Sequence, residues 1–357
     1  MSGNNLVKYW SPTELDVAQQ SLMQWYFLYI EGEKNRLPLE PYYVKGNLVH
    51  HDLIKPFYDK YDARAETHSD AKAFAEYAKG MWWRKIIGAE EAVREGKRPP
   101  IVWSYEDQKW EIATQIRKLA IPLYDMLSNK ERPIYSERRF RVELKQLGVD
   151  GRRMGLEWVP DEIRLEDSII KIRDYKTGFL LQRPKIDYYG MQPAVNILGV
   201  LLAAYQNKEV AENLGLAKKE IPHLFRDNDS LAGRIEFDYV MLEDKDFRTR
   251  EVKIKEIPAK ITLERFHGLI KLIHDTWGAF VRGEIEPKLN SPICDKCPVR
   301  ELCIERKENS NYKAGEQTKF DFAELPYRVR NVTVYGEPIK KSRRRVDTNT
   351  KRFKWNE

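Results

Sequence analysis

Cysteine is scarce in this chain of 357 residues, with three in total, all between positions 294 and 303. This excludes a disulfide-stabilised secreted scaffold, which needs paired cysteines spread along the chain. No uncharged apolar run approaches the roughly 20 residues of a membrane-spanning helix. The first residues, Met-Ser-Gly-Asn-Asn, are polar and do not resemble the apolar centre of a signal peptide. We therefore expect a cytoplasmic protein, in the nucleoid or host-cell cytoplasm, with no membrane partner.

Most of the chain also lacks an excess of charge of either sign. The formal net charge is +7, but residues 338–357 hold eight Lys or Arg and two acidic residues, so that the rest is near +1. This tail is predicted to bind nucleic-acid phosphates without sequence preference, or only to keep the chain in solution. The basic residues at its centre are Lys340, Lys341, Arg343, Arg344 and Arg345.

Apolar periodicity predicts an α/β or α+β fold in which helices flank a mixed sheet. We expect a mostly helical N-terminal region, 1–132, followed by a core with most of the strands. The predicted helices cover 11–31, 68–96, 105–129, 189–206 and 261–283. The predicted strands cover 134–147, 154–165, 169–176, 234–243 and 250–257.

The most informative segment is Asp-Tyr-Lys-Thr-Gly at 174–178, which closes the apolar strand 169–173. Side chains two apart on a strand project to the same face, so Asp174 and Lys176 would lie side by side. A carboxylate next to an ammonium on a rigid strand end suits a metal-dependent hydrolytic site. The alternative is a surface ion pair before a glycine turn.

A second carboxylate, Asp161, is predicted to face Asp174. If the hairpin turn is centred on Asp167 and Ser168, residues whose numbers add up to 335 lie opposite each other, with Cβ atoms roughly 4.5–5.5 Å apart. Two carboxylates this close repel unless a cation lies between them, and oxygen ligands favour Mg²⁺ or Mn²⁺. A register shift of one residue would place the two side chains on opposite faces.

Asp161 with Asp174-x-Lys176 resembles the motif of the PD-(D/E)XK nuclease superfamily. The pentapeptide Asp-Tyr-Lys-Thr-Gly is similar to the corresponding motif of the RecB-like branch, which includes AddB nucleases and CRISPR-associated adaptation nucleases. Further elements of the branch occur in the same order along the chain. They are Ser11 to Leu15 at the first helix, Gly46 to His50, Gln192 (with Asn196 where Tyr is common), and Cys294-x-x-Cys297-x₅-Cys303.

The resemblance implies a restriction-endonuclease-like fold and a role for each residue. Asp161 and Asp174 would bind one or two divalent ions, with His50 and the Tyr175 carbonyl completing the ligand set. Lys176 would orient the attacking water or offset charge on the phosphorus, and Gln192 would position the water or the DNA backbone. Glu137 is a further candidate carboxylate; because Arg138 and Arg139 follow it, the alternative is a solvated ion pair.

The clustered cysteines favour a metal role, because two thiolates separated by two residues can bind one zinc or iron–sulfur centre. In the branch members with a [4Fe–4S] cluster, a fourth Cys lies in the first helix, and Ser21 occupies that position here. Three alternatives remain open: a cluster with a non-cysteine ligand, zinc, or no metal.

The resemblance therefore predicts a Mg²⁺- or Mn²⁺-dependent DNA nuclease acting in replication, recombination or repair, alone or with a helicase or recombination partner. The leading expectation is an exonuclease on single-stranded or end-resected DNA. The alternatives are a structure-directed endonuclease and a non-catalytic DNA-binding subunit. Residues 1–357 contain no P-loop motif, so we expect no fused helicase motor. The expected divisions are 1–132, a nuclease core at 133–290, a cysteine clasp at 291–310 and a C-terminal extension at 311–357.

Overall fold

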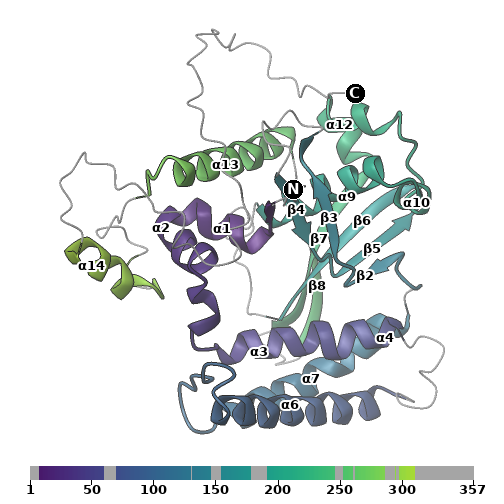
Figure 1. The fold of residues 1–357 in the computed structure, drawn as a ribbon. Helices are drawn as coiled ribbons and strands as arrows, with labels where there is room; N and C mark the ends of the chain where they lie inside the picture. Colours follow the sequence, from purple (N-terminus) through teal and green to yellow (C-terminus); the bar gives the residue numbers. More distant parts are fainter. Residues whose placement is uncertain are drawn as a thin grey trace, which may run out of the picture.

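The computed structural model describes residues 8–59, 70–129, 131–145, 154–177, 191–245, 252–259, 262–285, 294 and 297–309. Figure 1 shows helices packed on both sides of β-sheets. The α-helices are α1 (Pro12–Gln20), α2 (Leu22–Trp25), α3 (Pro41–Asn47), α4 (Lys55–Asp59), α6 (Ala71–Arg94), α7 (Gln108–Ser128), α9 (Met191–Gln206), α10 (Lys208–Asn213), α11 (Ile221–Leu224), α12 (Asn228–Ala232), α13 (Leu263–Val281) and α14 (Arg300–Asn309). Two π-helical turns, η1 (Tyr26–Ile30) and η3 (Leu48–Ile54), and one 3₁₀ turn, η2 (Glu33–Arg36), complete the helical segments.

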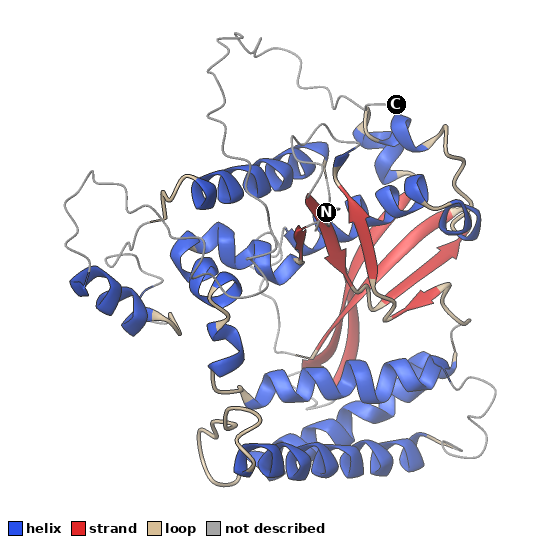
Figure 2. Cartoon of the chain, viewed as in Figure 1, coloured by secondary structure: helices blue, strands red, loops and turns tan. Residues whose placement is uncertain are grey.

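The strands form two sheets. They are β1 (Lys8–Trp10), β2 (Tyr135–Ser136), β3 (Phe140–Glu143), β4 (Met154–Trp158), β5 (Glu162–Glu166), β6 (Ile169–Lys176), β7 (Ile235–Lys245) and β8 (Val252–Pro258). The larger sheet has the order β2-β5-β6-β7-β8, and the smaller has the order β1-β4-β3. Each sheet contains one parallel pair, β6–β7 and β1–β4 respectively, so both are mixed (Figure 2). The predicted α/β class is confirmed.

The predicted hairpin register is confirmed. Glu162 faces Arg173 and Glu166 faces Ile169, which is the pairing expected for a turn centred on Asp167 and Ser168. Both turn residues have positive φ, 49° and 67°, as a two-residue type I′ turn requires. Asp161 immediately precedes β5, one step beyond the last paired residues and opposite the position of Asp174.

Two of the predicted strands were wrong in extent. The expected strand 154–165 is divided into β4 and β5, which belong to different sheets, and 134–147 is likewise divided into β2 and β3. Pro160 lies at the first break and has no N–H to continue a ladder. Glu137 lies at the second, with a positive φ of 49° that ends the extended conformation. The segment predicted as one meander therefore contributes strands to both sheets, and the chain passes from one sheet to the other at each of the two breaks.

The predicted continuous helix 11–31 was also wrong. It is interrupted at Ser21, whose backbone is extended (φ −159°, ψ 117°) and whose Oγ accepts a hydrogen bond from the N–H of Gln24. A serine can cap a new helix by offering its hydroxyl to a free backbone N–H, so the chain ends α1 and begins α2 here. The other long predicted helices correspond to α6, α7, α9 and α13.

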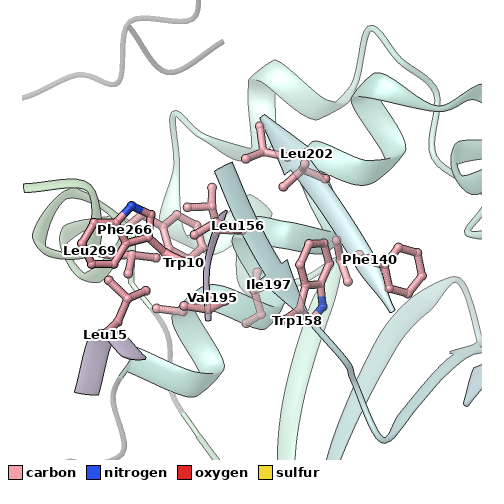
Figure 3. Close-up of a cluster of buried hydrophobic side chains, with 14 of the residues drawn as sticks. Trp10, Leu15, Phe140, Leu156, Trp158, Val195, Ile197, Leu202, Phe266 and Leu269 are labelled. Carbon is pink, nitrogen blue, oxygen red and sulfur yellow. The ribbon is translucent and has the colours of Figure 1, made fainter. Parts of the chain in front are cut away.

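The larger sheet separates two hydrophobic cores. One face of β6 and β7, with Ile170, Ile172 and Phe237, packs into the core that contains α1, α9 and α13; Figure 3 shows part of this core. The other face, with Tyr175 and Val240, packs against a helical layer of η3, α4, α6 and α7. In Figure 1 this layer lies below the sheet. Within the described residues, none of the helices has the length and apolar content needed to cross a membrane.

Candidate metal centre

Three potential metal ligands meet at the N-terminal end of β5, where the helical layer reaches the sheet. His50 Nδ1 lies 3.1 Å from Asp161 Oδ1 and 3.2 Å from Glu137 Oε1. The three ligand atoms lie within 4.8 Å of one another. The three residues come from η3, from the turn after β2 and from the turn before β5, so they are distant in sequence and joined only by the fold.

The backbone places Glu137 in this group. Its N–H donates to the carbonyl oxygens of Pro160 (3.1 Å) and Asp161 (3.3 Å), which ties the turn after β2 to the turn before β5. The positive φ of Glu137 is uncommon for a residue with a side chain, and such conformations gather at functional sites. Its side chain is only 3% exposed, so the predicted alternative of a solvated ion pair is wrong.

Asp161 also fixes the end of β6. The N–H of Tyr175 donates to Asp161 Oδ2 at 2.6 Å. On β6, Ile170 donates to Arg234 just before β7, so by alternation the N–H and carbonyl of Tyr175 face the β5 side. The carboxylate of Asp161 thus takes the place of a ladder partner just before β5 begins. The Tyr175 carbonyl, a predicted metal ligand, is directed to this same edge.

Asp174, Lys176 and Gln192 form a second, adjoining cluster. Lys176 Nζ lies 2.5 Å from Asp174 Oδ2 and donates to Gln192 Oε1 at 2.9 Å. Gln192 Nε2 donates in turn to Asp174 Oδ1. Asn196, where a Tyr was expected from the resemblance, holds the first turn of α9 by donating from its side chain to the Gln192 carbonyl. Lys176 is 28% exposed whereas Asp174 is 8% exposed, so the ammonium is the member that solvent reaches.

The electrostatics of the site favour a cation. Burial alone lowers the pKa of His50, but the charge of Asp161 and hydrogen bonds to Asp161 and Glu137 outweigh it and raise that pKa to about 10. Burial, with a contribution from Asp161, raises the pKa of Asp174 above its usual range against the opposing charge of Lys176. A proton on His50 therefore offsets the carboxylates, and a bound metal ion can replace that proton.

The spacing of the three ligands fits a small divalent ion. Adjacent ligands of an octahedral ion with bonds of 2.0–2.1 Å are separated by about 3 Å. The His50 contacts of 3.1 and 3.2 Å match that separation. One imidazole and two carboxylates form a donor set that accepts Mn²⁺ and related ions. The residues present thus fit a divalent metal.

In a comparison of the sequence with protein families, the family model for the PD-(D/E)XK nuclease superfamily matches residues 9–304. This range contains both clusters and most of the chain. The chain belongs to the PD-(D/E)XK nuclease superfamily. Members of this superfamily are metal-dependent nucleases, which agrees with a ligand group at the end of β5. No curated protein matches the sequence closely enough to be counted as a relative.

The cysteines do not form a comparable group. Cys303 is buried against the core with α1 and α13, and the N–H of Cys297 donates to the Cys294 carbonyl at 3.3 Å. Among the described residues, the sole set of three His, Cys, Asp or Glu ligands within 4.8 Å is His50, Glu137 and Asp161. An iron–sulfur or zinc centre stays a prediction. The basic residues predicted to contact DNA, Lys340 to Arg345, lie outside the described residues.

Sequence reasoning missed a buried acid next to this site. Glu162 follows Asp161 and is fully buried against the helical layer. The expected hairpin register already placed Glu162 opposite Arg173, and this pairing of opposite charges was a signal that could have identified it.

Proposed function

We propose that this protein is a Mg²⁺- or Mn²⁺-dependent nuclease that hydrolyses phosphodiester bonds in DNA. The observation that supports this most strongly is the convergence of His50, Glu137 and Asp161 beside Asp174 and Lys176 in a chain of this superfamily. His50, Glu137, Asp161, Asp174 and the Tyr175 carbonyl would hold the metal. When bound, the ion would polarise the scissile phosphate and lower the pKa of the attacking water.

The chain's own residues would supply the remaining chemistry. Lys176 lies next to Asp174, where its ammonium can offset the negative charge that develops on the phosphate. Gln192 binds both Lys176 and Asp174 and would hold the ammonium in one orientation toward the substrate. Its position at the start of α9, which is buried along most of its length, makes this support rigid.

We also propose that the enzyme is an exonuclease of the RecB-like branch acting on single-stranded or end-resected DNA. The support is the resemblance of Asp174 to Gly178, Gly46 to His50 and Gln192 to that branch. Gly46 is close to the Asp-Tyr-Lys-Thr segment, because a Cβ at Gly46 would lie 3.5 Å from Thr177 Oγ1. A helicase or recombination partner would supply the ends, and the clustering of all three cysteines within ten residues, without a spread of pairing partners, favours a reducing cytoplasm.

A nuclease assay on end-labelled DNA tests the activity. With Mn²⁺, we expect wild-type protein to release nucleotides from one end of linear single-stranded DNA and to leave circular single-stranded DNA intact. Lys176→Ala should lower kcat by about 10²–10³-fold, since a transition-state contact of this kind contributes that much. Lys171→Ala is the matched control, because Lys171 lies on the opposite face of β6 and pairs with Glu166.

The outcomes separate the candidate functions. Cleavage of circular DNA would show that the enzyme is an endonuclease and not an exonuclease. If wild-type protein with Mn²⁺ cleaves neither single- nor double-stranded DNA, the proposed activity fails and a non-catalytic DNA-binding subunit becomes the favoured function.

A binding experiment tests the metal site. The affinity for Mn²⁺, measured by electron paramagnetic resonance, should weaken at least about 10-fold in Glu137→Gln. Binding should be unchanged in Glu157→Gln, whose carboxylate pairs with Arg141 on β4 and β3.

A further inference from the structure

A set of polar side chains is buried where the helical layer meets β5 and β6. Its members are Tyr58, Glu162, Arg164, Arg173 and Tyr175, each with no more than 6% of its surface exposed. Glu162 is fully buried and lies at the centre of the set. Buried charges of this kind are costly unless every one is paired and hydrogen-bonded, so the arrangement needs a physical reason.

Glu162 uses both carboxylate oxygens in this network. Oε2 accepts from the hydroxyl of Tyr58 at 3.0 Å and from the hydroxyl of Tyr175. Oε1 accepts from Arg173 Nη1 at 2.9 Å and from Arg164 Nε. Arg164 Nη2 also donates to the Tyr58 hydroxyl at 3.1 Å. Two guanidinium groups and two hydroxyl groups therefore surround the Glu162 carboxylate, so that both of its oxygens have donors and its charge is paired.

Three of the four segments that contribute to the metal centre also contribute a member to this network; the turn with Glu137 does not. Glu162 is the neighbour of Asp161, and Tyr175 lies between Asp174 and Lys176. Tyr58 belongs to α4, which continues directly from η3 and His50. His50 and Tyr58 lie at different places along this continuous helical run, so they attach it to the sheet at two separate points.

We propose that Tyr58, Glu162 and Tyr175 form a positioning network that holds the metal ligands in place. The hydroxyl of Tyr58 fixes the helical run that presents His50, and the hydroxyl of Tyr175 fixes the strand end that presents Asp174. Both are bound to the residue next to Asp161, so one buried carboxylate sets the relative positions of three ligand segments. Hydrogen bonds to an ionised acceptor are strong and directional, which suits this role. This inference rests on the proposed metal-dependent activity.

The test removes one hydroxyl at a time in the full-length protein. Tyr58→Phe and Tyr175→Phe keep the ring and the Tyr175 carbonyl and delete the hydroxyl that binds Glu162; Tyr58→Phe also removes the acceptor for Arg164 Nη2. Loss of a support of this kind typically weakens metal affinity 10- to 100-fold. We expect the Mn²⁺ dissociation constant, measured by electron paramagnetic resonance, to rise at least about 10-fold in each variant. We expect kcat at saturating Mn²⁺ to fall less than the affinity does.

The control is Tyr105→Phe, because the Tyr105 hydroxyl also binds a carboxylate, that of Glu111, but on the exposed surface of the helical layer. Unfolding by urea in EDTA reports the stability of each variant without metal. If Tyr58→Phe and Tyr175→Phe lose stability there but bind Mn²⁺ as tightly as wild type, the network is only structural and the inference is overturned. If wild-type protein binds no Mn²⁺ and cleaves no DNA, the proposed function itself has failed.

Discussion

At the scale of single residues, Glu137 shows how the fold decides between two chemical roles. Its neighbours Arg138 and Arg139 made a surface ion pair a reasonable expectation. In the structure, the Arg138 guanidinium lies over the rings of Tyr135 (4.8 Å) and Phe140 (5.4 Å), so it does not pair with Glu137. The positive φ of Glu137 turns its side chain away from the strand and toward His50. Local sequence could not contain this information, because it depends on a backbone reversal at one residue.

Asp16 gives a prediction about pH at the same scale. Burial in α1 raises its pKa to about 6, and the charge of Lys176 only partly opposes this. Because the folded-state pKa is above the unfolded value of 3.8, folding favours the protonated form. This stabilising contribution is complete below pH 3.8 and is lost as the pH rises through 6. At pH 7.5 the ionised carboxylate therefore destabilises the folded protein.

We expect Asp16→Asn to raise the free energy of unfolding at pH 7.5 by about 1 kcal/mol, a value kept below the full shift because the side chain is partly exposed. The gain should disappear at pH 4, where wild-type Asp16 is protonated in the folded state. Urea unfolding at both pH values measures this. Asp125→Asn, at an exposed position of α7, is the control and should give little change. A gain of equal size at pH 4 and pH 7.5 would contradict the prediction.

At the scale of elements, the packing of α9 on β4 leads to a second prediction. A Cβ at Gly199 would lie 2.6 Å from ring atoms of Trp158. That ring is buried and stacked on Phe140 with centroids 5.2 Å apart, so it has no room to move. Gly199→Ala gains up to about 1 kcal/mol of helix propensity but overpacks the core at a cost of about 1–3 kcal/mol. We expect net destabilisation of about 1–2 kcal/mol by urea unfolding.

The matched control for that variant is Gly268→Ala in α13, where an added Cβ meets no atom within 4 Å. There the propensity term acts alone, and we expect stabilisation of up to about 1 kcal/mol. Opposite signs for the same substitution in two helices would establish that close packing against Trp158 requires glycine. Equal gains at both positions would contradict it.

Elements were predictable where a short-range pattern determines them. The β5–β6 hairpin follows from alternating side chains and a two-residue turn, so its register was predicted to the residue. The breaks at Ser21 and Pro160 were missed because the apolar pattern continues across them while the backbone does not. Ser21 ends one helix by capping the next, and periodicity has no means to detect a cap inside an apolar run.

At the scale of the whole molecule, the metal centre depends on long-range contacts. His50 reaches Asp161 only because the helical layer packs on the face of the sheet opposite the core with α9. The hairpin register predicted Asp161 and the family resemblance predicted His50, but local patterns could not predict that packing. The pairing of Glu162 with Arg173 could be read from the hairpin register, but the contact of Tyr58 with Glu162 depends on the same long-range packing. The division of the chain at 132, 290 and 310 stays a prediction.

The basic tail gives the last prediction, which concerns the charge of the whole chain. Residues 338–357 account for +6 of the net charge of +7, so removing them leaves a nearly neutral protein. The predicted ligands of the metal centre and Lys176 lie between positions 50 and 176, outside the tail, so we expect the chemistry at the metal centre to be independent of it. We expect its deletion to weaken binding to single-stranded DNA and to leave kcat at saturating DNA within about twofold. Each lost phosphate contact should reduce the magnitude of the slope of log Kobs against log[salt] by about 0.7.

Fluorescence anisotropy in EDTA, at salt concentrations from about 50 to about 200 mM, measures both the affinity and this slope. A variant with the eight Lys and Arg of the tail changed to Gln keeps the length and should behave like the deletion. If affinity and salt slope are unchanged in both variants, the tail serves only to keep the chain in solution, and DNA must be bound by local basic patches in residues 1–337.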